Sequence, residues 1–154
     1  MSVRLQASVP SAASPAAVWS VLTDWAGQSR WIPLTTVRVT HGPEQGVGAR
    51  VEALSGFWLG RRPVGLLDRF VVTGWTPPGA QAGELEVLHL GPYFTGEGVF
   101  RVTPTSIGTT ITATELFALP GGPLTETPAR LALPALRRGF AASLRKLASL
   151  SEAA

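Results

Sequence analysis

Residues 108–119 read GTTITATELFAL, and their side chains alternate in character as they do along a β-strand. Ile111, Ala113 and Phe117 fall on one face, which is therefore predicted to lie against the core. Glu115 falls on the same face. A carboxylate in such a place either has a partner or takes up a proton. Glu115 is thus a candidate ligand anchor or acid/base group, unless a neighbouring arginine pairs with it or the strand end turns it to solvent.

Five more segments upstream of residue 108 alternate in the same way, and turns rich in glycine and proline separate them. Their connections are short, which favours neighbouring antiparallel strands. Together with residues 108–119 they predict a six-stranded antiparallel meander, and residues 2–9 predict a separate first strand. The five segments are 35–41, 47–54, 64–75, 83–90 and 93–103.

Two short helical segments are predicted between the first strand and the meander. Ser14 and Pro15 are typical of a helix start, because serine caps the first turn and proline fits its first position. The helix that they open is predicted over residues 15–25, where apolar residues recur at helical spacing. A further helical turn is predicted over residues 28–32, which Pro33 ends.

The end of the chain predicts one long helix that begins at about residue 127, because apolar residues recur there at three- and four-residue steps. Arg137 and Arg145 fall away from the apolar stripe and are expected to be exposed. Pro134 lies inside the stretch and is expected to kink or delay the helix. The stripe predicted to pack on the sheet contains Leu133, Leu136, Phe140, Leu144 and Leu147.

The composition is that of a folded domain. The chain has 154 residues, 45% hydrophobic and 15% charged, so we expect a single domain spanning residues 1–154. Cysteine is absent, which excludes disulfides and thiol catalysis. The net charge of +3 comes from scattered arginines, and a nucleic-acid groove needs a denser basic stripe. No apolar run suits a membrane-spanning helix and residues 1–14 lack a signal-peptide pattern, so we expect a cytoplasmic protein without stable membrane insertion.

The order of one strand, two short helices, six strands and one long helix resembles the helix-grip fold of the START/Bet v 1-like (SRPBCC) superfamily, most closely its bacterial polyketide cyclase/dehydrase and lipid-transport branch. The stretches that carry the resemblance are 14–33, 46–53, 68–78, 96–112 and 140–152. It implies an α+β fold in which a curved antiparallel sheet of about seven strands wraps around the C-terminal helix. It also implies an interior cavity for a lipid, a polyketide or a similar molecule.

Three polar side chains are candidates for work in such a cavity: Glu115, His89 and Tyr93. His89 shares a strand face with apolar residues and suits a general base or a structural hydrogen bond. The hydroxyl of Tyr93 suits either a ligand oxygen or a protein partner. Asp68 and Arg69 open the stretch DRFVVTGW, where one of them could reach the cavity and an exposed strand start is the default expectation. The apolar residues predicted to contact the ligand are Trp58, Phe100, Phe117, Leu136 and Phe140.

Trp58 stands in the stretch SGFWLGRRP, residues 55–63, near a predicted hairpin end. Three large apolar residues in a row there predict the mouth of the cavity, a membrane contact or the interface of a homodimer, and packing of Trp58 under a neighbouring loop is the alternative. The two histidines are far apart and no metal-ligand motif is present, so we expect no metal. No dinucleotide-binding or phosphate-binding loop is found, so we expect no cofactor.

Three functions therefore remain open from the sequence. A carrier of an apolar or amphipathic ligand should have an almost wholly apolar cavity with one polar anchor. A polyketide cyclase or dehydratase that needs no cofactor should bring two polar groups within hydrogen-bond reach inside the cavity. A protein-interaction module should have a filled cavity and an exposed apolar patch.

Overall fold

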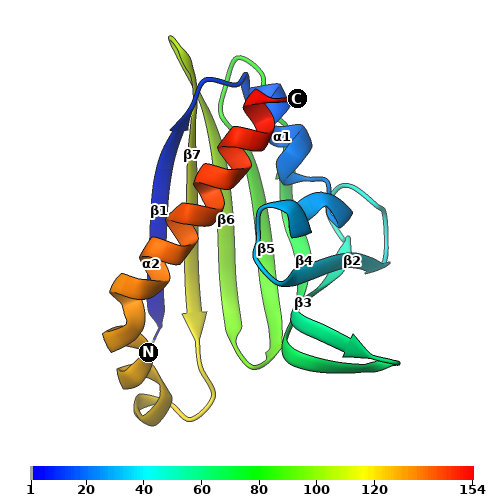
Figure 1. The fold of residues 1–154 in the computed structure, drawn as a ribbon, viewed down its shortest axis with the longest axis vertical. Helices are drawn as coiled ribbons and strands as arrows, with labels where there is room; N and C mark the ends of the chain where they lie inside the picture. The colour runs from blue at the N-terminus through cyan, green and yellow to red at the C-terminus, as the bar shows by residue number, and fades with distance from the viewer. Residues whose placement is uncertain (1) are drawn as a thin grey trace.

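The computed structural model describes residues 2–154 and shows one curved antiparallel sheet with helices on a single face (Figure 1). The strands and helices follow the predicted order, and the α+β helix-grip fold is confirmed. Their bounds are β1 (Val3–Ser11), α1 (Pro15–Leu22), η1 (Ala26–Arg30), β2 (Thr35–His41), β3 (Arg50–Leu59), β4 (Arg62–Thr76), β5 (Gly83–Pro92), β6 (Thr95–Thr105), β7 (Gly108–Ala118) and α2 (Pro123–Glu152).

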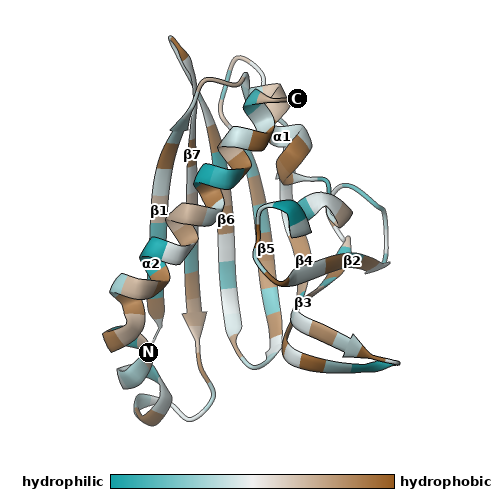
Figure 2. Ribbon diagram, viewed as in Figure 1, coloured by the Kyte–Doolittle hydropathy of each residue, from teal (hydrophilic) through white to brown (hydrophobic). Residues whose placement is uncertain are grey.

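The seven strands are ordered β1-β7-β6-β5-β4-β3-β2, and each neighbouring pair is antiparallel. The segment from β2 to β7 is thus the predicted meander, and β1 is added at its far edge. β1 pairs only with β7, along a register that runs from Val3 opposite Phe117 to Ser11 opposite Thr109. The hydropathy colours in Figure 2 alternate along the strands, as expected when one face is buried.

The long helix α2 crosses the sheet diagonally in front of β1, β7 and β6 (Figure 1). Its C-terminal half packs in the core, where Leu144 and Leu147 are fully buried. Glu152 ties this end to the end of β1: its Oε1 accepts hydrogen bonds from Ser11 Oγ at 3.0 Å and from the backbone N–H of Ala12 at 2.9 Å. The sheet and the helix are therefore fixed to each other at one end.

The N-terminal half of α2 differs from the prediction in its start and in the burial of Leu136. The helix begins at Pro123, before the predicted start, and it is not delayed by Pro134. Leu136 was expected to be buried but is 43% exposed, because this half of the helix lies over an open part of the sheet. Arg137 and Arg145 are exposed as expected, and Phe140 is partly buried.

The core lies where α1 and the C-terminal half of α2 meet the middle strands. Aromatic rings fill much of it, including a perpendicular pair of Trp19 and Trp75 with ring centroids 5.3 Å apart. Trp25 packs on Phe70 with centroids 5.8 Å apart. Aromatic pairs of this kind are favourable beyond the apolar area that they bury.

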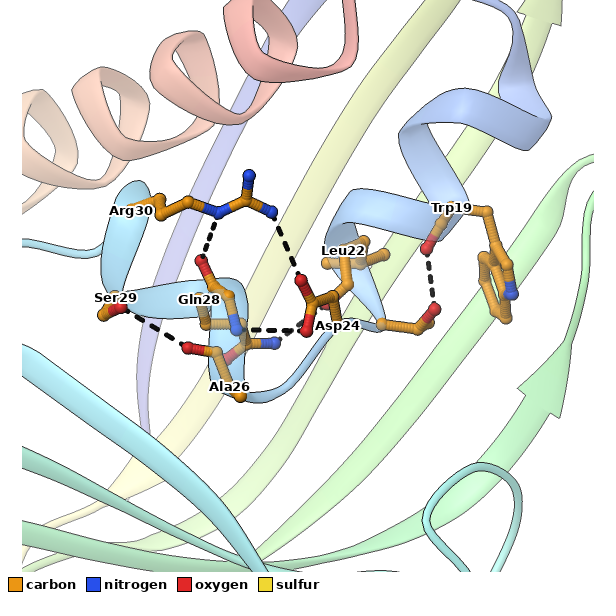
Figure 3. Close-up of polar contacts among 9 residues, drawn as sticks. Trp19, Leu22, Asp24, Ala26, Gln28, Ser29 and Arg30 are labelled. Carbon is orange, nitrogen blue, oxygen red and sulfur yellow. Dashed lines mark hydrogen bonds and ion pairs between the residues drawn. The ribbon is translucent and has the colours of Figure 1, made fainter. Parts of the chain in front are cut away.

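The turn from α1 into η1 is fixed by side-chain hydrogen bonds to the backbone (Figure 3). Thr23 Oγ1 donates to the carbonyl of Trp19 at 2.8 Å, and Gln28 Nε2 donates to the carbonyl of Leu22 at 2.9 Å. Asp24 accepts from the N–H of Gly27 at 3.1 Å and from Arg30 at 3.2 Å. This network holds η1 beside the open face of the sheet.

The hairpin of β3 and β4 is longer than predicted, since β3 continues to Leu59 and β4 begins at Arg62. Phe57 is 60% exposed and Leu59 67% exposed near its tip. In the part of the chain that the structure describes, no helix is both long and apolar enough to cross a membrane.

Candidate functional site

Two adjoining compartments lie between the sheet and α2. The outer compartment has a volume of about 480 Å³ beneath the N-terminal half of the helix. The inner compartment has a volume of about 160 Å³ and reaches toward η1 and the core. The side chains of Asp68, His89 and Glu115 line both of them. These three residues therefore form the boundary between the compartments, and we call them the polar cluster.

The polar cluster is built from three strands. Asp68 comes from β4, His89 from β5 and Glu115 from β7. Nδ1 of His89 lies 2.9 Å and 3.0 Å from the two carboxylate oxygens of Asp68, and its Nε2 lies 3.0 Å from Oε2 of Glu115. The side chains of Asp68, His89 and Glu115 are 16%, 7% and 17% exposed. One imidazole thus bridges two carboxylates at a site that is mostly buried from solvent.

The environment sets the protonation of this cluster. Burial alone would lower the pKa of His89, but the hydrogen bonds and charges of Asp68 and Glu115 outweigh it and raise the pKa to about 9. At neutral pH the ring is therefore an imidazolium that donates to both carboxylates. Burial raises the pKa of Glu115, and the charge of Asp68 adds to this effect, whereas His89 opposes it.

Gly98 gives the carboxylate of Glu115 its place. Gly98 lies opposite Glu115 on the neighbouring strand β6, between the strands that carry His89 and Glu115. A Cβ atom there would stand 2.7 Å from Oε2 and 2.8 Å from Oε1 of Glu115. Glycine inside a strand is typical of such a close approach, and Gly98 is one of two glycines in the stretch GEGVF at residues 96–100.

Replacing Gly98 by alanine is expected to push the Glu115 carboxylate away from His89, because the carboxylate is the mobile end of a long side chain. The pKa of His89 should then fall below about 9, while Asp68 keeps it above 6.5. An NMR titration of the His89 ring measures this change. Gly79→Ala is the matched control, since a Cβ there meets nothing within 4 Å. An unchanged His89 pKa in Gly98→Ala would contradict the arrangement.

Aromatic rings surround the polar cluster. The His89 ring lies 5.0 Å from Phe94 and 5.8 Å from Phe70, measured between centroids. Phe94 in turn contacts Phe117 with centroids 5.9 Å apart. The walls beside the cluster are therefore apolar, which strengthens electrostatic interactions within it.

The structure brings most of the predicted site residues to the compartments. Glu115 and His89 contact each other directly. Tyr93, Phe117 and Leu136 line the outer compartment, where Tyr93 is 48% exposed, and Phe100 and Phe140 line the inner one.

Trp58 is the exception among the predicted residues. It lies outside the linings of both compartments, and the guanidinium of Arg38 stacks 4.6 Å from the centroid of its ring. This cation–π contact places the Trp58 side chain beside Arg38, which is itself exposed, and away from the cavity.

Sequence reasoning missed two residues. Asp68 was expected to be exposed by default, but its side chain is only 16% exposed and lines both compartments. It shares the inward face of Phe70 and Val72, and this alternation was the available signal. Trp31 lines the inner compartment and its Nε1 is buried without a hydrogen-bond partner among residues 2–154. No motif in the sequence indicated this.

A metal site does not form from these side chains. Both ring nitrogens of His89 face carboxylate oxygens, so neither is free to bind a metal ion. Across residues 2–154, no other group of histidine, aspartate or glutamate side chains surrounds a point where a metal ion would bind.

The sequence of the chain and its fold are those of one protein family. A family model described as polyketide cyclase / dehydrase and lipid transport matches residues 2–152, and the chain belongs to this family. The resemblance seen in the sequence is thereby confirmed.

Solved structures show the same fold over almost the whole chain. The Zhui aromatase/cyclase from Streptomyces sp. R1128 is 19% identical, with a TM-score of 0.70 over 99% of this chain and 94% of that one. The protein TTHA0849 from Thermus thermophilus is 17% identical, with a TM-score of 0.69 over 99% and 98%. A hypothetical protein from Helicobacter pylori is 14% identical, with a TM-score of 0.73 over 98% and 88%. A search of curated proteins found no match.

Proposed function

We propose that the protein binds a small apolar or amphipathic molecule in the two compartments between the sheet and α2. The observation that carries this proposal is the pair of adjoining compartments of about 480 and 160 Å³ that share one polar cluster. Small-molecule sites typically occupy about 300–1,000 Å³, with mostly apolar walls and a few polar groups that fix orientation. Membership of the polyketide cyclase / dehydrase and lipid transport family supports the same function.

The buried indole of Trp31 is a second observation that supports ligand binding. Its Nε1–H lines the inner compartment and has no acceptor among residues 2–154. A buried donor without an acceptor costs about 1–3 kcal/mol. A ligand oxygen in the inner compartment would accept this hydrogen bond and remove the cost.

Filling the outer compartment should weaken binding of an environment-sensitive apolar dye. Leu136 lines this compartment, so Leu136→Trp is expected to weaken dye binding by about tenfold or more. Leu131→Trp is the matched control, because Leu131 is 80% exposed on the same helix. Fluorescence titration measures both variants, and native mass spectrometry of the purified protein identifies any molecule that it retains. Equal dye binding by the two variants would contradict binding in this compartment.

Acid/base catalysis in the same cavity is the second candidate function. It is favoured because Nε2 of His89 lies 3.0 Å from Oε2 of Glu115 inside the cavity. A cyclase or dehydratase is expected to have two polar groups within hydrogen-bond reach in this way. Glu115 is the better proton carrier of the two, because both N–H groups of His89 already face carboxylates. With a reactive polyketide chain as substrate, Glu115→Gln should abolish conversion and retain binding. A carrier would bind the chain and convert none of it in either form.

The interaction-module hypothesis is the weakest of the three. It requires a filled cavity, and the compartments beneath α2 are not filled by side chains. Exposed apolar side chains such as Phe57 and Leu59 near the tip of the β3–β4 hairpin are what supports it.

A further inference from the structure

The polar cluster carries one more acidic group than basic groups. Asp68 and Glu115 are both carboxylic acids, and His89 is the one base between them. No arginine or lysine of residues 2–154 lines either compartment. Arg69, the neighbour of Asp68 in sequence, instead pairs with Glu52 at 3.1 Å. With both acids ionised and the imidazole protonated, the cavity therefore holds one uncompensated negative charge.

Within the polar cluster, Glu115 is the carboxylate best placed to contact a ligand. Both oxygens of Asp68 are occupied by Nδ1 of His89. Glu115 uses only Oε2 toward His89, and Oε1 receives no hydrogen bond from the described residues 2–154. Glu115 also lines both compartments, and its side chain is 17% exposed.

The walls beside Glu115 suit a cation as well. Phe94, Phe117 and Tyr93 line the outer compartment, and the faces of such rings attract ammonium groups. Attraction between opposite charges is much stronger in a dry, apolar site than in water. A ligand carboxylate would meet the opposite situation, because no free cationic side chain of the described residues lines the cavity.

We infer that the ligand of this cavity is an amphipathic organic cation, whose ammonium group contacts Glu115 and whose apolar part fills the compartments. This inference rests on the proposed binding function and specifies its ligand class. A neutral molecule of the same shape should bind more weakly, and a carboxylate should bind most weakly.

In the acid range, where Glu115 takes up a proton, binding of the cation should be coupled to loss of that proton. Burial raises the pKa of Glu115, and an ammonium group beside it would favour the ionised form. The titratable groups that face it are Asp68 from β4, His89 from β5 and Tyr93 from the β5–β6 turn, whereas β1 and α2 contribute only uncharged side chains. Affinity for a permanent cation should therefore increase as the pH rises through the acid range.

The test compares three ligands of equal chain length: decyltrimethylammonium, decanol and decanoate. Isothermal titration, below the concentrations at which they form micelles, is expected to show the ammonium binding at least about tenfold more tightly than the alcohol at neutral pH. Decanoate should bind more weakly than either. Repeating the decyltrimethylammonium titration at about pH 5 in buffers with different ionisation enthalpies measures the proton released, and this ligand should bind more weakly at about pH 5 than at pH 7.

Glu115→Gln isolates the charge, because it keeps the shape of the side chain. It should remove the preference for the ammonium over the alcohol and leave binding of the alcohol nearly unchanged. Glu97→Gln is the matched control, since Glu97 is exposed on β6 outside both compartments, and it should retain the preference.

The outcomes separate the inference from the function on which it rests. Equal binding of all three ligands, tighter binding of decanoate, or a preference that survives Glu115→Gln would overturn the cationic ligand and leave the binding cavity in place. Absence of binding by all three ligands, together with failure of the apolar dye to bind, would overturn both.

Discussion

The free energy of unfolding is expected to fall by about 3 kcal/mol as the pH rises from 6.5 to beyond about 9, because His89 then loses its proton. In the folded protein the protonated ring donates one N–H to Asp68 and the other to Glu115. These carboxylates hold the pKa of His89 at about 9, against an ordinary value of 6.5. The stabilisation is fully present below pH 6.5 and disappears as the pH passes through about 9. The size follows from the difference between the two pKa values at about 1.4 kcal/mol per unit.

Urea unfolding at a series of pH values measures this loss. His89→Gln should be less stable at neutral pH and should have lost the decline above pH 6.5. His41→Gln is the matched control, because His41 is exposed at the end of β2, and it should unfold like the unmodified protein. A decline of the same size in His89→Gln would show that another group is responsible.

Truncation of Leu144 is the second change with a large expected effect. Leu144 is fully buried in the core beneath the C-terminal half of α2, so Leu144→Ala should reduce the free energy of unfolding by about 2–5 kcal/mol. The loss combines the apolar contacts that are removed with the cavity that remains. Denaturant unfolding, with the midpoint and the slope both recorded, measures it.

Leu131→Ala is the internal comparison for this truncation. Leu131 is on the same helix but is 80% exposed, so the same change there should cost less than about 0.5 kcal/mol. Similar losses at the two positions would mean that α2 does not pack on the sheet through the face described.

Most of the fold could be predicted from the sequence because its local patterns are strong. The strand predicted over residues 35–41 is β2 without change, and the alternation of residues 108–119 gives β7 in the correct register. A local pattern cannot predict whether a helix residue packs on side chains of the sheet or lies over an open compartment. Leu136 has the correct helical spacing for burial, but it meets an open compartment instead of side chains.

The site was predicted only in part, because its contacts join distant strands. The alternation was sufficient to turn Glu115 inward, and an arginine was the expected structural partner. The actual partner is His89, whose approach depends on the registers of β5 with β6 and of β6 with β7, and on the space left by Gly98. Asp68 lies inside the predicted strand 64–75, but no local pattern shows that His89 of the neighbouring strand β5 would contact it.

The pairing of β1 with β7 bears on how the chain reaches this structure. β1 is the first strand along the chain, yet its one neighbour in the sheet is the last strand, and the helix tied to it by Glu152 comes later still. During synthesis, β1 therefore emerges long before the segments that cover it, while β2 to β6 can each pair with the strand made just before or after. Contacts that close so long a loop are slow to form. The edge strand is expected to be the last part of the sheet to become ordered, and its exposed backbone is the part of the nascent chain that most needs protection from aggregation.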